Sequence, residues 1–306
     1  AGQGESGSCP TIPTGVAFTS RVKFPALKLA AASWIGRDSA LGAGRIHEAA
    51  TLGRTGYFAR WRFDYRLYRP VLLYAREHGI PIVALNAPVE LTNRISEVGL
   101  DGLSADEKQE LPQIARSDTV YIEHLRQFFA QHPGADKRSF DRFVDVQLTW
   151  DETMADTAAR YLEANPGRRM VVLAGSGHIA NRWGIPDRLQ RRLPDARLAT
   201  VVFDDGKEIT KRLADYLVFS PEAELPKAGL LGLYLDTTGE GVKVRSVADD
   251  SAAGAAGIKT GDLLVAIDGQ PLPSYSALRM AMLDLAPGEG VRLTYRRKGL
   301  FGDPAE

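Results

Sequence analysis

The strongest constraint on the fold is a short apolar run that ends in a glycine-rich loop and leads into a helix. The run is Met170-Val171-Val172-Leu173, the loop is residues 174–179, and the helical pattern begins at Gly184. This order places His178 just past the carboxyl end of a buried strand, the edge where open α/β sheets build ligand sites. Glycines on both sides of Ser176 let a ligand approach the backbone closely. His178 is therefore predicted to bind a metal, move a proton or cap a cofactor; the alternative is a histidine that only caps the strand end.

Strands and helices alternate beyond about residue 54. Apolar runs at 81–85 and 198–203 predict short buried strands, and a capping box at Ser104–Glu107 predicts a helix start. Further helices are predicted at 71–76, 117–132 and 139–165 and around Arg188. This alternation favours an α/β fold with a mostly parallel sheet covered by helices. Residues 1–53 show no convincing element, so they are expected to be poorly organised, as a truncated or divergent segment.

Composition excludes several functional classes. Lys and Arg together number 38, as do Asp and Glu, so the chain lacks the basic surplus of a nucleic-acid binder. Cys9 is the only cysteine, which excludes an intrachain disulfide and a multi-cysteine metal site. No run approaches the roughly 20 apolar residues of a membrane span. The chain shows no signal peptide, and we expect its true amino terminus to lie upstream.

The pattern changes after residues 221–227, which we interpret as a linker. Residues 228–306 contain short strands with one helix. The stretch Gly261-Asp262-Leu263-Leu264, with its continuation to Gln270, carries most of the resemblance described next. This segment resembles a bacterial PDZ domain of the kind found in periplasmic proteases. Its backbone N–H groups near Gly232 would face a peptide carboxylate, and the peptide would add a strand to the sheet. The predicted peptide-binding residues are Leu231, Gly232, Leu233, Leu278 and Met282; the alternative is a packing module that meets no peptide.

Two positions in the first domain converge on one crevice if its strands are parallel. Asn86 and His178 both follow the carboxyl ends of predicted strands. Gln147 lies within an apolar stripe of the long helix, and its amide either borders this crevice or bonds a neighbouring loop. The stripe has three- and four-residue spacing and is formed by Phe143, Trp150, Met154 and Ala158. If the amide borders the crevice, Gln147, Asp151 and His178 become neighbours of one ligand.

Residues 54–220 resemble a ChaN-type haem-binding uptake domain, which shares its fold with Tiki and erythromycin-esterase-like proteins. The resemblance rests on residues 61–70, 80–86 and 147–154 and on the His178 loop with its following helix. It departs from the family at the start, because the usual Gly-Glu-x-His motif is missing and His47 lacks the preceding strand and glycine. The other half of the family site therefore cannot be assigned.

The resemblance implies a non-covalently bound haem. The candidate haem or ligand residues are His178, Ser176, Gly177, Asn86, Gln147 and Asp151. Tyrosine can also ligate haem iron, but spacing does not choose among Tyr57, Tyr65, Tyr68 and Tyr74, which resemble packing residues. A divalent metal is a further expectation, although only His178 can be named as its ligand and a catalytic metal generally needs about three.

Three functional hypotheses follow. The leading one is a cell-envelope haem-binding protein of the iron-uptake type, periplasmic or outer-membrane-associated by its resemblance, with a PDZ module that binds a C-terminal peptide of a partner. The second is a metal-dependent hydrolase with His178 as ligand and Asp151 or another carboxylate as general base. The third is a non-catalytic adaptor in which only the PDZ groove works. A homodimer is also an expectation, and the Gly175-Ser176-Gly177 spacing argues against a serine hydrolase.

Overall fold

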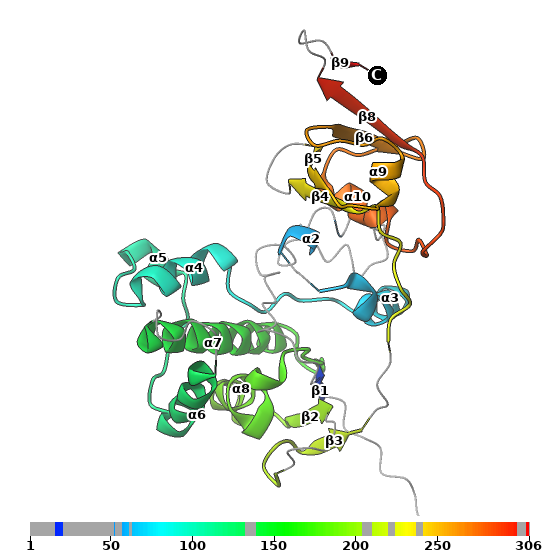
Figure 1. The fold of residues 1–306 in the computed structure, drawn as a ribbon. Coiled ribbons are helices and arrows are strands. Elements are labelled where there is room, and N and C mark those ends of the chain that lie inside the picture. Colours follow the sequence, from blue (N-terminus) through cyan, green and yellow to red (C-terminus); the bar gives the residue numbers. More distant parts are fainter. Residues whose placement is uncertain are drawn as a thin grey trace, which may run out of the picture. The chain divides into compact units, whose positions relative to one another are not determined.

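The computed structural model describes residues 16–20, 52, 57–60, 63–131, 139–203, 210–219, 224–236, 241–298 and 304–305. The chain divides into two compact units. Unit 1 comprises Ala1–Ser33 and Ala84–Pro221, and unit 2 comprises Trp34–Val83 and Glu222–Glu306 (Figure 1). The domain limits expected from the sequence, 54–220 and 228–306 with a linker between them, stay predictions.

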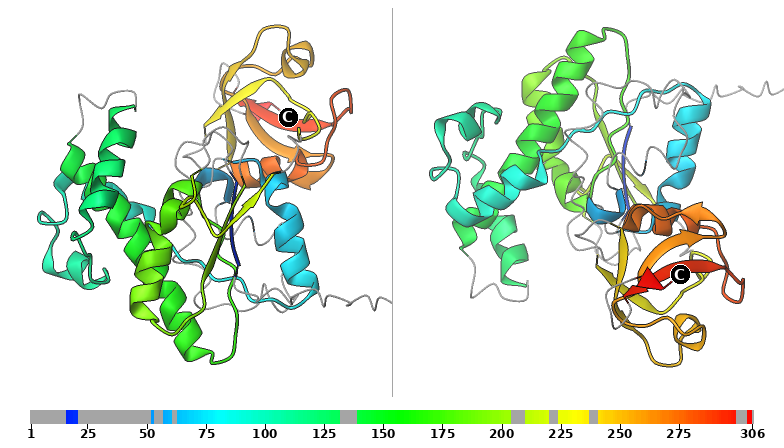
Figure 2. Two further views of the ribbon diagram at one scale, coloured as in Figure 1. Left: turned by 90° about the horizontal axis from the view of Figure 1, so that it is seen from below. Right: turned by 90° about the horizontal axis from the view of Figure 1, so that it is seen from above.

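The helices of unit 1 begin where the sequence offers a capping side chain. In α5 (Ala105–Gln109) the Ser104 hydroxyl accepts from the Glu107 N–H and the Glu107 carboxylate accepts from the Ser104 N–H, which confirms the predicted capping box. Asp118 caps α6 (Thr119–Ala130), and Ser139 caps the 25-residue α7 (Phe140–Ala164). Together with α4 (Val89–Val98) and α8 (Ile185–Arg192), they form a layer in which α7 contacts α4, α6 and α8 (Figure 2).

A parallel sheet accompanies this helical layer. Its strands β1 (Val16–Ser20), β2 (Ala199–Phe203) and β3 (Tyr216–Val218) pair in that order, and both pairings are parallel. The predicted class, a parallel sheet covered by helices, is therefore confirmed.

Three predictions about individual strands are wrong. Residues 81–85 form no strand, and the run 170–173 contributes only a single bridging residue, Leu173. Conversely, β1 lies within residues 1–53, where no element was expected. The reason is that an apolar run becomes a strand only where a neighbouring backbone supplies hydrogen bonds, and hydrophobic periodicity does not report that partner.

The core of unit 1 lies between α4, α7 and α8. The stripe predicted on α7 enters it, because Trp150, Met154 and Ala158 are all buried there. A buried carboxylate fixes the helices further: Glu152 is fully buried, with side-chain nitrogens of Arg191 and Arg192 2.6 Å from its oxygens and the Nε of Arg188 at 3.3 Å. These ion pairs join α7 to α8 and so set the position of the loop that precedes α8.

Unit 2 contains a mixed set of short helices and an antiparallel sheet. Its sheet order is β4-β5-β6-β8-β9, with β7 paired to β6. The strands are β4 (Leu233–Asp236), β5 (Val242–Val247), β6 (Leu263–Ile267), β7 (Gln270–Pro271), β8 (Leu293–Lys298) and β9 (Pro304–Ala305). The helices α9 (Ala252–Ala255) and α10 (Tyr275–Ala281) follow β5 and β7 in the chain, as the resemblance to a PDZ domain implied.

A small hydrophobic core of unit 2 forms near the end of α10. Tyr57 and Phe58 of α2 (Tyr57–Arg60) are buried there together with Tyr65 of η1 (Tyr65–Leu67) and Leu283. The next helix, α3 (Arg69–Glu77), adds an ion pair at 2.6 Å between the Arg69 Nη1 and the Asp284 Oδ1.

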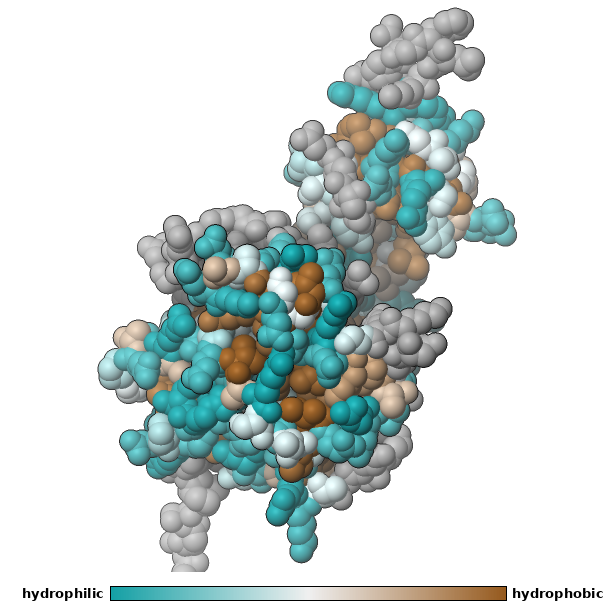
Figure 3. Space-filling model, turned by 90° about the vertical axis from the view of Figure 1, so that its left-hand side faces the viewer, coloured by the Kyte–Doolittle hydropathy of each residue, from teal (hydrophilic) through white to brown (hydrophobic). Residues whose placement is uncertain are grey.

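The surface carries apolar side chains in small groups among hydrophilic ones on the face drawn in Figure 3. In the described ranges, no helix combines the length and the apolar character that crossing a bilayer requires.

Candidate functional site

The predicted loop carries His178 at the end of a short turn. Residues Ser176–His178 form a 3-10 turn, η3, in which the His178 N–H donates to the Gly175 carbonyl at 2.9 Å. The Ile179 N–H donates to the Ser176 carbonyl at 3.0 Å, and Ile179 itself is fully buried in the core. The buried isoleucine anchors the loop, and the turn directs the preceding His178 toward α7.

His178 contacts a carboxylate that the sequence analysis had placed among its candidates. The His178 Nδ1 lies 2.6 Å from the Asp151 Oδ1, and the other oxygen, Oδ2, accepts a 2.8 Å hydrogen bond from the Tyr121 hydroxyl. Asp151 is fully buried on α7, and the His178 side chain is 8% exposed. Trp150 lies edge-on to the imidazole, with 6.1 Å between ring centroids. Tyr121, Asp151 and His178 therefore form one connected buried cluster.

Burial and the Asp151 carboxylate influence where the protons of Tyr121 and His178 lie. Burial raises the pKa of Tyr121 well above its ordinary value, and the neighbouring Asp151 raises it further, so the hydroxyl stays protonated and donates. The carboxylate favours a proton on the His178 Nδ1, which leaves the lone pair of a neutral ring on Nε2. Among the described residues, Nε2 has no hydrogen-bond partner. Such a ring is suited to accept a proton or to ligate a metal.

Gly184 makes the close packing of this cluster possible. Its φ is +73°, a conformation that favours glycine, and a Cβ there would meet the His178 carbonyl oxygen at 2.6 Å and the Asp151 Oδ1 at 3.0 Å. Any side chain would therefore push on both the loop and the carboxylate.

The other predicted site residues lie in different surroundings. Gly177 is exposed, and none of the described residues lies within 4 Å of the position of a Cβ. Asn86 is buried, but its Oδ1 accepts from the adjacent Ala87 N–H at 2.8 Å, a local cap. Gln147 is buried on α7 one turn before Asp151, and its amide has no side-chain hydrogen bond within the described ranges. The structure thus joins His178 to Asp151, and the ligand-binding roles of all six residues stay predictions.

Neither the contact of Tyr121 nor the role of Gly184 was predicted from the sequence. Tyr121 belongs to an apolar pair with Leu125 on α6, and both pack in the same buried cluster. That spacing indicates a buried helix face but not that the hydroxyl reaches a carboxylate on another helix. A glycine between Trp183 and Ile185 was visible in the sequence, yet only the structure shows what it faces.

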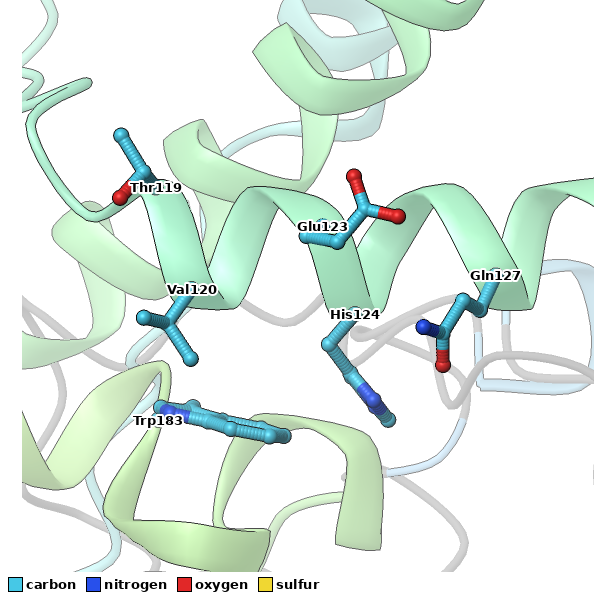
Figure 4. A pocket seen from close by; sticks show the side chains of 6 residues that line it. All are labelled: Thr119, Val120, Glu123, His124, Gln127 and Trp183. Atoms are coloured by element: carbon cyan, nitrogen blue, oxygen red, sulfur yellow. The ribbon is translucent and has the colours of Figure 1, made fainter.

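A shallow pocket of about 400 Å³ opens on the outer side of α6 (Figure 4). His124 and Val120 lie over the indole of Trp183, and the His124 and Trp183 ring centroids are 4.6 Å apart. Burial lowers the pKa of His124, so its ring is neutral near pH 7. Because Tyr121 on the same helix bonds Asp151, α6 contacts the buried cluster with one face and lines this pocket with another.

Other ligand groups are sparse in the described part of the chain. No cluster of three or more His, Cys, Asp or Glu that could hold a metal ion occurs there, so the divalent-metal expectation gains no support. Tyr57 and Tyr65 are buried packing residues, and burial raises the pKa of Tyr57. Tyr74 is exposed and stacks on His78, with 4.0 Å between ring centroids. The site motif sought around His47 falls outside the described residues.

The residues predicted to bind a peptide lie close together in unit 2. Gly232 has φ +74°, and a Cβ there would meet the Ser251 Cβ at 2.2 Å. Leu231, Leu233, Leu278 and Met282 pack in one apolar cluster. Among the strands that the structure describes, β4 pairs only with β5. An open strand edge beside an apolar cluster is what strand addition by a peptide requires.

A helix-covered parallel sheet with a buried histidine–carboxylate pair, joined in one chain to a PDZ-type sheet, defines a two-module binding protein. The comparisons with known proteins give its family. The profile described as haem-binding uptake, Tiki superfamily, ChaN matches residues 37–189, and a PDZ profile matches residues 229–300. The chain therefore belongs to the ChaN family of the Tiki superfamily and carries a PDZ domain behind its haem-binding uptake domain.

The individual proteins that this chain resembles share less than 30% identity with it. RETICULATA-RELATED 5, a chloroplastic protein of Arabidopsis thaliana, is 23% identical over 186 residues, 54% of this chain and 25% of that protein. The periplasmic pH-dependent serine endoprotease DegQ of Escherichia coli is 29% identical over 129 residues, 42% of this chain and 26% of its own. The chain thus spans about a quarter of the length of these relatives. A structure showing cofacial haem binding to ChaN of Campylobacter jejuni shares 17% identity and a TM-score of 0.47, covering 67% of this chain and 73% of that one.

Proposed function

We propose that this protein binds haem non-covalently in the cell envelope, as an iron-uptake-type protein, and that its PDZ domain binds the C-terminal end of a partner chain. One observation carries the haem proposal beyond family membership. The His178 ring is held at Nδ1 by a fully buried carboxylate, and its Nε2 is without a partner among the described residues. A carboxylate-oriented imidazole is the arrangement that metal-ligating histidines use.

The residues present fit a haem at this loop. Histidine is a common ligand of haem iron, and the donor atom offered here would be the Nε2 of His178. Its neighbour Gly177 is exposed, and none of the described residues lies within 4 Å of a Cβ built there. Bound haem would supply an iron centre, and His178 is the residue that would hold it. The chain itself does the rest: Asp151 holds the proton at Nδ1, Tyr121 holds Asp151, and Trp150 limits rotation of the ring.

A haem titration of the full chain tests this proposal. We expect a saturable Soret shift for the wild type and a weaker, spectrally different complex for His178→Ala. His124→Ala is the matched control, since this histidine lies at the pocket of α6 and has no contact with Asp151; it should titrate as the wild type does. An unchanged Soret spectrum in His178→Ala would remove His178 as the ligand.

The peptide proposal rests on Gly232 and the free edge of β4. The tight packing of Gly232 on Ser251 shapes the turn before β4, and the apolar cluster of Leu231, Leu233, Leu278 and Met282 suits an apolar C-terminal residue. Calorimetric titration with a peptide ending in a free carboxylate tests it. The same peptide with an amidated end should lose its binding, and equal binding of both would exclude carboxylate recognition.

The envelope location is proposed from two resemblances. The haem-binding uptake family and the periplasmic endoprotease DegQ, which shares 29% identity over part of this chain, both favour it. Fractionation of cells that express the complete gene tests this location, and recovery of the protein only in the cytoplasmic fraction would contradict it.

A further inference from the structure

Unit 1 contains a second cavity, of about 320 Å³, that no part of the proposed function uses. Its walls come from the end of α7, residues 168–172, α8 and residues 193–199. The apolar lining includes Leu162, Met170, Val172, Ile179, Leu189 and Leu198. The lining also includes three exposed arginines, Arg168, Arg169 and Arg197.

No acidic side chain of the described residues lines this cavity beside the three arginines. None of the three arginines forms an ion pair with a residue that the structure describes. The arginines of α8 differ, because Arg188, Arg191 and Arg192 all pair with Glu152. An apolar cavity beneath uncompensated guanidinium groups is complementary to a ligand with an apolar body and an anionic end.

We propose that this cavity binds a single-chain fatty carboxylate, with the tail among the leucines and the carboxylate at Arg168, Arg169 and Arg197. A volume of 320 Å³ lies at the lower end of the roughly 300–1,000 Å³ typical of small-molecule sites. At about 30 Å³ for each water-sized group, it takes a tail of about ten carbons. Guanidinium forks match a carboxylate in a bidentate manner, which favours this head group over a neutral alcohol.

This inference does not rest on haem binding, although Ile179, which anchors the His178 loop, is one of the residues that line the cavity. Neither Asp151 nor His178 lines the cavity. Haem also combines an apolar body with carboxylates, so it enters the experiment as a competitor and its success at these arginines would count against a fatty carboxylate.

Calorimetric titration of the full chain with dodecanoate, below its micellar concentration, tests the proposal. We expect saturable binding, and about tenfold weaker binding for Arg168→Gln and for Arg197→Gln, because a hydrogen bond to a charged group is lost in each. Met170→Trp should abolish binding by filling the cavity. Arg160→Gln is the matched control, as Arg160 is an exposed arginine of α7 outside the lining, and it should bind as the wild type does.

Three results would overturn the proposal. One is the absence of saturable dodecanoate binding to a chain whose circular dichroism shows it folded. Another is equal affinity for dodecyltrimethylammonium, which would mean non-specific burial of the tail. The third is displacement of dodecanoate by haem with the same arginine dependence. His178→Ala should leave dodecanoate binding unchanged, so failure of the haem proposal and failure of this one are separable.

Discussion

His178 and Asp151 meet through a 2.6 Å contact between Nδ1 and Oδ1 at a place where Asp151 is fully buried and His178 is 8% exposed. The two residues are 27 positions apart and come from a loop and a helix. Their contact determines which imidazole nitrogen is available to a ligand, and hence what the loop can do chemically.

Replacing the carboxylate tests this relationship. In Asp151→Asn the amide can donate to Nδ1, which moves the ring proton to Nε2 and removes the ligating lone pair. We expect haem affinity to fall about 10–100-fold, the usual loss for an outer-shell partner of a metal-binding histidine. A Soret titration measures it. Asp156→Asn, on the same helix but paired with Arg160 and Arg192, is the control and should titrate normally. Equal affinities of both variants would show that Asp151 does not orient the ligand.

Gly184→Ala should damage both stability and the site. The left-handed conformation costs a non-glycine residue roughly 1–2 kcal/mol, and the clash with the His178 carbonyl oxygen adds about 1–3 kcal/mol. Gly167→Ala separates these effects, because Gly167 has φ +79° with nothing within 4 Å of a Cβ. Urea unfolding should therefore show a larger loss for Gly184→Ala, and only that variant should weaken haem binding. Equal losses in both variants would contradict the close approach.

Gly232→Ala should weaken peptide binding at least tenfold, since a Cβ would meet the Ser251 Cβ at 2.2 Å and displace the turn before β4. The control is Gly257→Ala, where φ is +79° and a Cβ meets nothing within 4 Å. Calorimetry with a C-terminal peptide compares the two. If both variants bind like the wild type, the turn at Gly232 does not form the carboxylate site.

Asp262 should make the stability of the PDZ domain depend on pH at acid values. It accepts bonds at 2.7 Å from the Arg297 Nε and Nη2 and from the Lys259 N–H, and Arg297 is the main cause of its lowered pKa. A lowered pKa in the folded state means that this stabilisation is present above the unfolded value of about 3.9 and is lost as pH falls below it. Amide exchange of β5 and β6 should show this loss in the wild type and not in Asp262→Asn. A matching pH dependence in the variant would contradict the assignment.

Local signals predicted much of the helical structure. The capping box at Ser104 and Glu107 and the stripe of Trp150, Met154 and Ala158 depend on residues within one helix, so spacing alone reports them. The short strands expected in the PDZ segment likewise follow from alternating runs, such as Val242–Val247, which forms β5.

Contacts between elements that are distant in the sequence could not be predicted from local patterns. The apolar runs at 81–85 and 170–173 have strand composition, but pairing depends on which backbone lies beside them. Asp151 and His178 were both candidates, yet their contact depends on how α7 and the loop meet, which the ion pairs of Glu152 with α8 help to set. Tyr121 carried no signal beyond an apolar helix face, because a tyrosine hydroxyl finds its partner only in the folded chain.

The haem titration of His178→Ala beside the wild type tests the central claim most directly. The account predicts a saturable Soret shift for the wild type and for His124→Ala, and a weakened, spectrally altered complex for His178→Ala. Identical Soret spectra and affinities for all three chains would contradict it.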